Sequence, residues 1–300
     1  MAELEHVAPS ELVHDVRRSS RVAGVSAAFR ALTFLAVLAF LWGLWELWHW
    51  IGTRFKLTWP FPVNDVTMPH LHRIVEALFQ PAQANGPWLL HVLFHASLFT
   101  AKEAALGFVL GAVGGFAIAV VLSQSRFLER GIIPYVVASQ TIPLLAIAPM
   151  VVVGLGSKGI HDWLAVAVLA AYLTFFPVTI NALRGLQSAD PRAVELLRSY
   201  AAGRWRILWK LQAPSSLPYL FSAFRIAAPL SIVGAIISEP SASIQGGLGG
   251  AIVNFNQYYS IEPQELWATN VISALLGIAF FLAVVAAERV IVRRAPENVA

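Results

Sequence analysis

The chain has 300 residues, of which 57% are hydrophobic and 13% are charged. A soluble domain carries about 25% charged residues, so this composition excludes an ordinary water-soluble protein and predicts an integral membrane protein. The net charge of +4 does not by itself indicate nucleic acid, and the lack of cysteine excludes disulfides, thiolate metal sites and thiol catalysis.

The first apolar run, Ala31 to Ile51, is long enough to span a bilayer. Its far end is rich in tryptophan, which favours the membrane interface. From Gly52 to Pro87 the chain is polar and rich in proline, which predicts an extramembrane connection with a short amphipathic turn from Leu71 to Phe79. The second apolar run extends from Trp88 to Leu122.

Two features interrupt the second run. Lys102 and Glu103 are ionisable residues within it, and the simplest expectation is that both reach an interface. The run also contains closely spaced glycines, which predict close helix packing in lipid. These are Gly107, Gly111, Gly114 and Gly115.

A third span is predicted from Ile132 to Leu155. It contains Pro134, Pro143 and Pro149, so it should face the protein interior, where freed carbonyl groups find partners. A fourth span runs from Leu164 to Leu183 with Pro177 inside it. The fifth and sixth spans, Leu217–Ile237 and Leu266–Ala287, are separated by a loop rich in glycine and glutamine.

The distribution of Lys and Arg predicts that both termini are cytoplasmic, because positive charge accumulates on the cytoplasmic side. With this orientation the outer loops hold only Arg54, Lys56, Arg73 and Lys158. The inner segments hold Arg17, Arg18, Arg21, Arg30, Arg126, Arg130, Arg184, Arg192, Arg198, Arg204, Arg206, Lys210, Arg289, Arg293 and Arg294.

The segment from Arg184 to Pro218 is too polar to span and should form two short cytoplasmic helices. Asp190-Pro191 is a good helix start, and the first helix should run from Ala193 to Tyr200. The second helix is predicted from Arg204 to Leu211, with Pro214 and Pro218 ending it.

This segment resembles the cytoplasmic Glu-Ala-Ala loop of the permeases of binding-protein-dependent ABC importers. In that loop a Glu is followed after six residues by Gly, and after thirteen more by Pro. Glu195, Ala201 and Pro214 occupy these positions, although the alanines after Glu are replaced by leucines and the usual Gly is Ala201. If the site requires a positive φ, alanine costs on the order of 1 kcal/mol, unless the turn has moved to Gly203.

Further stretches are similar to the sulfonate, taurine, nitrate and vitamin-precursor subfamily of these permeases, over roughly Trp88 to Ile291. They are SQTIPLLAIAPMVVVGLG (139–156), FRIA (224–227), Ser238-Glu239 and GGLGGAI (246–252). The resemblance implies an all-α bundle of about six transmembrane helices with the type I importer fold. It divides the chain into a tail, first helix and extracytoplasmic connection (1–87), a permease core with its coupling loop (88–291, loop 184–218) and a cytoplasmic tail (292–300).

The resemblance also implies the function and the partners. The protein would be a non-catalytic, multi-pass permease in the bacterial cytoplasmic membrane, working as a homodimer with an ABC ATPase dimer and an extracytoplasmic binding protein. It would bind no cofactor and no nucleic acid, because ATP and Mg²⁺ belong to the ATPase; the chain has no GxxxxGK[ST] phosphate loop. The solute would be a riboflavin or pyrimidine vitamin precursor, with sulfonate, taurine or nitrate as alternatives.

The residues expected to contact the ATPase are Glu195, Ser199, Tyr200, Ala201, Ala202, Gly203, Arg204, Trp205 and Pro214. Candidates for the substrate path are Gln140, Thr141, Pro143, Asn181, Ser231, Ser238 and Glu239. No catalytic residue is expected, and no metal site, because His91 and His95 at i, i+4 have no third ligand in the sequence pattern.

Two other classes of membrane protein would show features that this sequence lacks. An intramembrane enzyme would need a catalytic set at membrane depth, such as paired aspartates or a Ser-His pair, and none is visible. A secondary transporter should show duplicated halves or a charged relay within its spans, and neither is evident.

Overall fold

The computed structural model describes residues 9–56, 62–83 and 86–292, and every described regular element is helical. The all-α expectation is therefore confirmed. The chain divides into two compact units, Met1–Arg73 and Ile74–Ala300. Arg293, Arg294 and the rest of the tail predicted from residue 292 lie outside the described residues. So do the side chains of Arg17, Arg18, Arg21 and Arg30.

In the first unit, helix α1 (Pro9–Arg54) contains the predicted first span. Its apolar part, Leu32–Arg54, is long enough to cross a membrane and is almost wholly exposed. The chain enters the short helix α2 (Leu71–Ala77) at the end of this unit.

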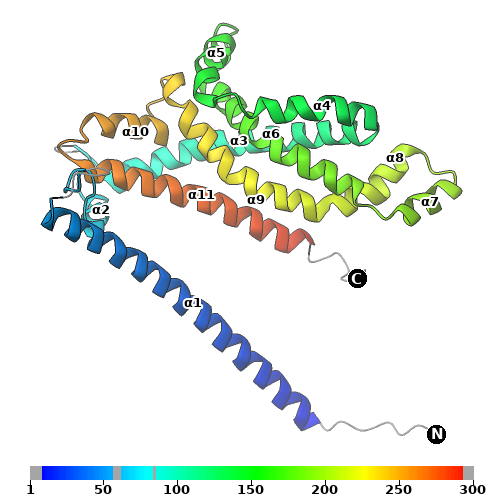
Figure 1. The fold of residues 1–300 in the computed structure, drawn as a ribbon, viewed down its shortest axis with the longest axis horizontal. Coiled ribbons are helices and arrows are strands. Elements are labelled where there is room, and N and C mark those ends of the chain that lie inside the picture. Colours follow the sequence, from blue (N-terminus) through cyan, green and yellow to red (C-terminus); the bar gives the residue numbers. More distant parts are fainter. Residues whose placement is uncertain (1–8, 57–61, 84–85, 293–300) are drawn as a thin grey trace. The chain divides into compact units, whose positions relative to one another are not determined.

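The second unit is built around α3 (Leu89–Ser123), α6 (Asp162–Gln187) and α9 (Ala213–Ser238), shown in teal, green and yellow in Figure 1. Helix α6 packs on both α3 and α9, and α11 (Pro263–Val292) packs on α9. The Arg225 Nε donates to Glu288 Oε2 at 2.8 Å and so links α9 to α11. The apolar pattern predicted these two spans but not the ion pair between them.

The expected third span is wrong as a single helix. It consists of α4 (Arg126–Ser139) and α5 (Leu144–Gly156), which are bent by 96° at the break between them (Figure 1). Of the three prolines, only Pro143 lies at the break, where it directly precedes the first residue of α5. A proline disfavours helical conformation in the residue before it, which explains why the helix is interrupted there. Pro134 and Pro149 lie inside their helices.

The number of membrane spans depends on how the bent pair α4–α5 is counted. Fourteen helical residues rise only about 21 Å, which is shorter than the roughly 30 Å hydrocarbon core. The described residues therefore hold five helices able to cross a membrane, or six if the bent pair forms one span. The predicted loop between the fifth and sixth spans also contains a helix, α10 (Leu248–Gln257).

Glycines on one face of α3 allow α6 to approach closely. A Cβ added at Gly111 would clash with Thr174 and lie 2.8 Å from the Ala171 carbonyl oxygen, and one at Gly115 would lie 2.6 Å from the Phe175 carbonyl oxygen. A Cβ added at Gly107 would likewise lie 2.7 Å from the Ala167 carbonyl oxygen of α6. Gly114 faces open space, so the packing prediction is confirmed for three of the four glycines.

This contact yields a prediction with a control on the same helix. Gly111→Ala should lower the free energy of unfolding by about 1–3 kcal/mol, because the new methyl group overpacks the α3–α6 contact. Gly114→Ala should cause no loss, since its Cβ meets nothing within 4 Å. Denaturation in mixed micelles measures both changes, and equal losses would contradict the packing described for Gly111.

Candidate functional site

Two short helices project from the second unit and form the predicted coupling segment. Helix α7 (Pro191–Ser199) begins at Asp190, whose Oδ1 accepts a hydrogen bond from the Arg192 amide at 2.9 Å. Pro191 occupies the first turn, where its missing N–H costs nothing. Helix α8 (Arg204–Ile207) follows after a four-residue corner. The predicted pair of helices is present.

The corner turns at Ala201, which has a φ of +54°, whereas Gly203 has a φ of −68°. The Ala202 amide donates to the Leu197 carbonyl at 3.0 Å, and the Ala201 amide donates to that of Arg198 at 2.9 Å. These two bonds form a Schellman motif, which usually places glycine at the left-handed position. The turn has therefore not moved to Gly203, and Ala201 carries the strain.

The second helix does not end where the sequence suggested. Helix α8 continues through a π-helical turn (Leu208–Gln212) into α9, so Arg204–Ser238 is one apolar helical stretch. Pro214 and Pro218 do not terminate it. In the wider turn the Ala213 amide bonds to the Leu208 carbonyl, and Pro214 follows in the first turn of α9. Proline is tolerated there because local π geometry re-satisfies neighbouring carbonyls.

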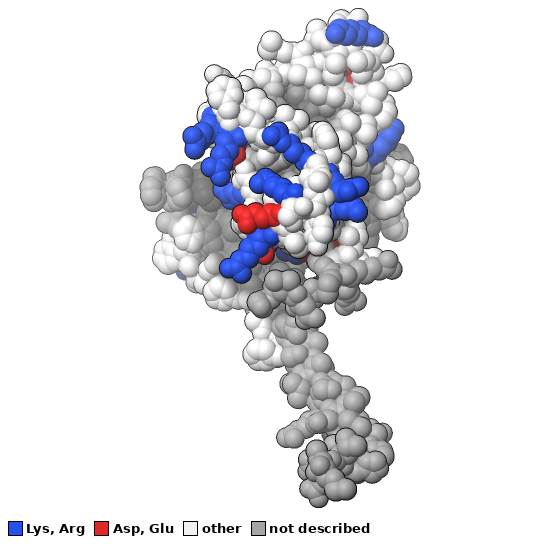
Figure 2. Space-filling model, turned by 90° about the vertical axis from the view of Figure 1, so that its right-hand side faces the viewer, with Lys and Arg blue, Asp and Glu red and all other residues white. Residues whose placement is uncertain are grey.

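The corner exposes large apolar side chains on a basic surface. Tyr200 is 75% exposed, Trp205 66% and Leu196 57%. Figure 2 looks onto the end of the molecule where α7 and α8 lie in Figure 1, and Lys and Arg side chains gather on this face. The exposed basic residues of α4, α6, α7, α8 and the π turn are Arg126, Arg130, Arg184, Arg192, Arg198, Arg204, Arg206 and Lys210.

The other predicted contact residues belong to the same segment. Glu195 and Ser199 are exposed on α7, and Pro214 is exposed on α9. Ala202 is half-buried, and with Gly203 it borders a groove of about 590 Å³ that also includes Ser123 and Gln124 at the end of α3. The coupling segment thus combines a strained corner, an exposed apolar tip and a groove at its base.

The predicted substrate-path residues do not form one cluster. Thr141 and Pro143 are exposed at the α4–α5 break, and Gln140 there is half-buried. The Gln140 Nε2 has no hydrogen-bond partner among the described residues. The Asn181 side chain donates to the Pro177 carbonyl at 2.8 Å within α6.

Ser231, Ser238 and Glu239 belong to the buried part of α9 and its end. The Ser231 hydroxyl donates to the Ala228 carbonyl within the helix, as a packing residue would. Ser238 Oγ is buried without a hydrogen-bond partner among the described residues. Glu239 is fully buried and organises the polar contacts described next.

The Glu239 carboxylate joins three helices. It accepts hydrogen bonds from the Thr100 hydroxyl of α3 and from the Gly249 amide at the start of α10. The Thr100 Oγ1 in turn accepts from the Leu248 amide at 2.9 Å. A carboxylate at a helix N-terminus satisfies free amides and interacts favourably with the helix dipole. Glu239 therefore caps α10 from another helix.

Glu103 is the residue whose role the sequence did not reveal. It is fully buried, so its carboxyl group does not reach the protein surface, and neither of its carboxyl oxygens has a hydrogen-bond partner among the described residues. Its neighbour Lys102 lies 3.9 Å from the centre of the Trp163 ring, a cation–π contact with α6. An acidic residue within a span was the available signal.

Residues 107–295 match the family described as the inner membrane component of binding-protein-dependent transport systems. The chain is 33% identical to the formylaminopyrimidine transport permease protein ThiX of Halalkalibacterium halodurans, over 62% of this chain and 72% of that protein. It is 30% identical to the riboflavin transport system permease protein RibX of Chloroflexus aurantiacus, over 73% of this chain and 78% of that protein.

One solved structure is similar in fold. It is titled as the crystal structure of an amino acid ABC transporter with histidines, and it matches with a TM-score of 0.53 and 18% sequence identity. The match covers 67% of this chain and 94% of that chain. At this identity the likeness concerns the fold alone.

The strained corner gives a second prediction. Ala201→Gly should stabilise the Schellman motif by about 1 kcal/mol, because glycine adopts positive φ without a Cβ penalty. Gly203→Ala is the matched control: its φ is negative and its Cβ would meet nothing within 4 Å. Hydrogen exchange at the Ala202 amide should slow about fivefold in the first variant only. Unchanged exchange in Ala201→Gly would contradict strain at this corner.

Proposed function

Because this chain belongs to the family of binding-protein-dependent transport system inner membrane components, we propose that it imports a vitamin-precursor-like solute as one half of a transmembrane dimer. The chain is an ABC importer permease with several apolar helices that place it in the membrane. In the proposed assembly two copies form the pathway, an ATPase dimer binds below it and a binding protein delivers solute from outside.

The observation that carries this proposal is the exposed apolar tip of the α7–α8 corner. Large apolar side chains on an exposed surface mark interaction sites, and Tyr200 and Trp205 are both at least 66% exposed. The corner is tied to α9 through an unbroken helical stretch, Arg204–Ser238. A tip of this kind suits an ATPase partner, because closure of the ATPase dimer would move α9 as a body.

The proposed orientation places the α7–α8 corner and both termini in the cytoplasm. The exposed basic residues of α7 and α8 support it, since Lys and Arg accumulate on that side. ATP is available only in the cytoplasm, which requires the tip to be there. In this arrangement ATP and Mg²⁺ are bound by the partner, and the permease itself is neither an enzyme nor a cofactor protein.

The proposed solute is a pyrimidine vitamin precursor or riboflavin. Support comes from the names of two relatives, which transport formylaminopyrimidine and riboflavin, each at 30% identity or more. The polar residues at the α4–α5 break and at the end of α9 are the proposed contacts along the path. They include Gln140, whose amide group has no partner among the described residues.

The coupling proposal predicts a loss of transport without a loss of folding. Glu195→Arg reverses the charge of an exposed side chain on α7, and Ala202→Trp fills the groove beside the corner. Each should reduce ATPase co-purification and solute uptake at least tenfold, while the amount of protein in the membrane stays unchanged. Uptake is measured with labelled riboflavin and formylaminopyrimidine in cells that express the whole transporter.

The control is Glu76→Arg, the same charge reversal at an exposed position of α2. It should leave uptake and ATPase co-purification at the level of the unaltered protein. Normal coupling in both Glu195→Arg and Ala202→Trp would overturn the assignment of the corner. If the unaltered transporter co-purifies with its ATPase but takes up neither riboflavin nor formylaminopyrimidine, only the proposed solute would be overturned.

The orientation is tested by single cysteines, since the chain has none of its own. Ser199 and Ser260 are both exposed, in α7 and between α10 and α11. In intact cells a membrane-impermeant maleimide should label Ser260→Cys and leave Ser199→Cys unlabelled until the membrane is permeabilised. The reverse pattern would place the α7–α8 corner outside the cell and rule out the proposed mechanism.

A further inference from the structure

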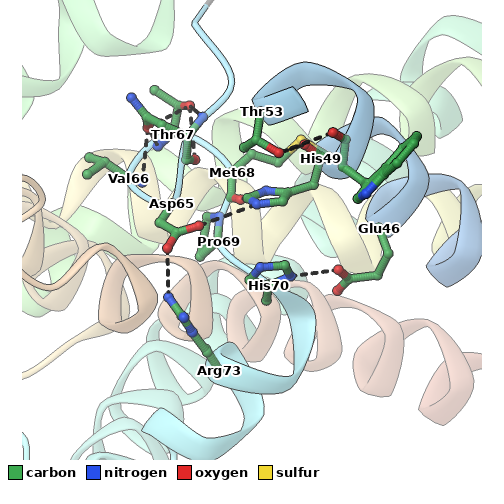
Figure 3. Close-up of polar contacts among 12 residues, drawn as sticks. Glu46, His49, Thr53, Asp65, Val66, Thr67, Met68, Pro69, His70 and Arg73 are labelled. Carbon is green, nitrogen blue, oxygen red and sulfur yellow. Dashed lines mark hydrogen bonds and ion pairs between the residues drawn. The ribbon is translucent and has the colours of Figure 1, made fainter. Parts of the chain in front are cut away.

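A cluster of potential metal ligands lies within the first unit, where α1 meets the chain that leads to α2. His49, Asp65 and His70 each offer one ligand atom, and these atoms lie within 4.8 Å of one another. Figure 3 shows the two imidazole rings side by side with the Asp65 carboxylate beside them. The ring centres of His49 and His70 are 4.2 Å apart.

The surroundings of His49 leave one of its nitrogens available to a metal. Its Nδ1 lies 2.8 Å from the Met68 carbonyl oxygen, which can only accept, so Nδ1 carries a proton and donates. The Nε2 faces Asp65 Oδ1 at a distance of 3.3 Å. His49 is only 4% exposed, so the ring is held by packing as well.

His70 is held in the same manner by a carboxylate. Its Nδ1 donates to Glu46 Oε2 at 2.6 Å, and the other Glu46 oxygen accepts from the Leu71 amide at 3.3 Å. Both oxygens of Glu46 are therefore in use, and the Nε2 of His70 remains available. Metal-binding histidines commonly donate their second N–H to a carbonyl or carboxylate, which fixes the tautomer and the ring orientation.

The loop that presents Asp65 is also ordered by its own hydrogen bonds. The Asn64 side chain accepts hydrogen bonds from the backbone amides of Thr67 at 2.8 Å and Val66 at 3.0 Å. Asp65 Oδ2 accepts from Arg73 at 2.9 Å, which leaves Oδ1 turned to His49. The carboxylate is thus positioned before any ion arrives.

We propose that His49 Nε2, Asp65 Oδ1 and His70 Nε2 bind a divalent transition-metal ion of the zinc type. Two ligands about 2.0–2.1 Å from a tetrahedral zinc ion lie about 3.3 Å apart, which matches the separation of His49 Nε2 and Asp65 Oδ1. Two imidazoles and one carboxylate suit zinc and leave a fourth position for water.

A second possible ligand set, Glu46, His70 and His72, fits less well. Glu46 already accepts two hydrogen bonds, whereas exposed His72 contacts the His70 ring and has no hydrogen bond or ion pair with any other described residue. Glu46 therefore acts as an orienting group for His70. The metal would fasten the chain around Asp65 and His70 to the end of α1, so binding would add to the stability of this unit.

The test uses the full chain, purified in detergent through an affinity tag without histidine, and titrated calorimetrically with zinc sulfate. One zinc ion per chain is expected. Asp65→Asn and His70→Ala should each weaken binding at least 100-fold. Glu46→Gln, which removes no ligand, should weaken it 10- to 100-fold through the loss of the orienting carboxylate.

Two controls separate this site from other histidines. The double variant His91→Ala, His95→Ala removes an exposed pair on α3 and should leave zinc affinity unchanged, as should His72→Ala. Circular dichroism and elution volume must match those of the unaltered chain. Failure of that chain to bind zinc, or unchanged binding in Asp65→Asn and His70→Ala, would overturn the proposal. Loss in His72→Ala with normal binding in Asp65→Asn would overturn this ligand set.

Discussion

The close approach of α3 to α6 is the contact on which the second unit depends. In lipid there is no hydrophobic force between helices, so association relies on close packing and on hydrogen bonds between helices. Glycines on α3 bring the backbones together, and the Thr174 hydroxyl lies 3.3 Å from the Gly107 carbonyl oxygen across the contact. Gly234 of α9 packs against Ala170 of α6 in the same manner. These three helices position both the α7–α8 corner and the buried carboxylates.

The buried side chain of Glu239 explains the glycine-rich motif GGLGGAI (246–252). None of its glycines has a positive φ, so backbone conformation does not explain them. A Cβ at Gly247 or Gly249 would clash with the Glu239 side chain or the Ile236 carbonyl, and one at Gly250 would clash with the Ile244 carbonyl. Gly246 faces open space. Three of these four glycines therefore allow the start of α10 to pack closely against the chain around Glu239. Without them Glu239 would be a desolvated group with fewer donors, which is costly in a buried site.

Hydropathy and charge predicted the membrane class and most spans, because each signal is contained within one segment. The sequence could not predict partners that are distant along the chain, such as Thr100 and Glu239 or His49 and His70. It also misjudged three prolines: Pro143 was expected within a span but lies at a helix break, whereas Pro214 and Pro218 were expected to end a helix but lie within α9. The loop motif showed that position 201 was unusual, but only its backbone angle resolved which residue carries the turn.

The π turn at Leu208–Gln212 has a mechanical consequence. It contains one more residue per turn than an α-helix, so it rotates everything above it by about 100° around the helix axis relative to α8. This angular offset decides which flank of α9 lies over the exposed tip formed by Tyr200 and Trp205. In the proposed coupling mechanism, a force on that tip would therefore act on α9 off its axis, and the inserted residue would help to set the direction in which α9 turns.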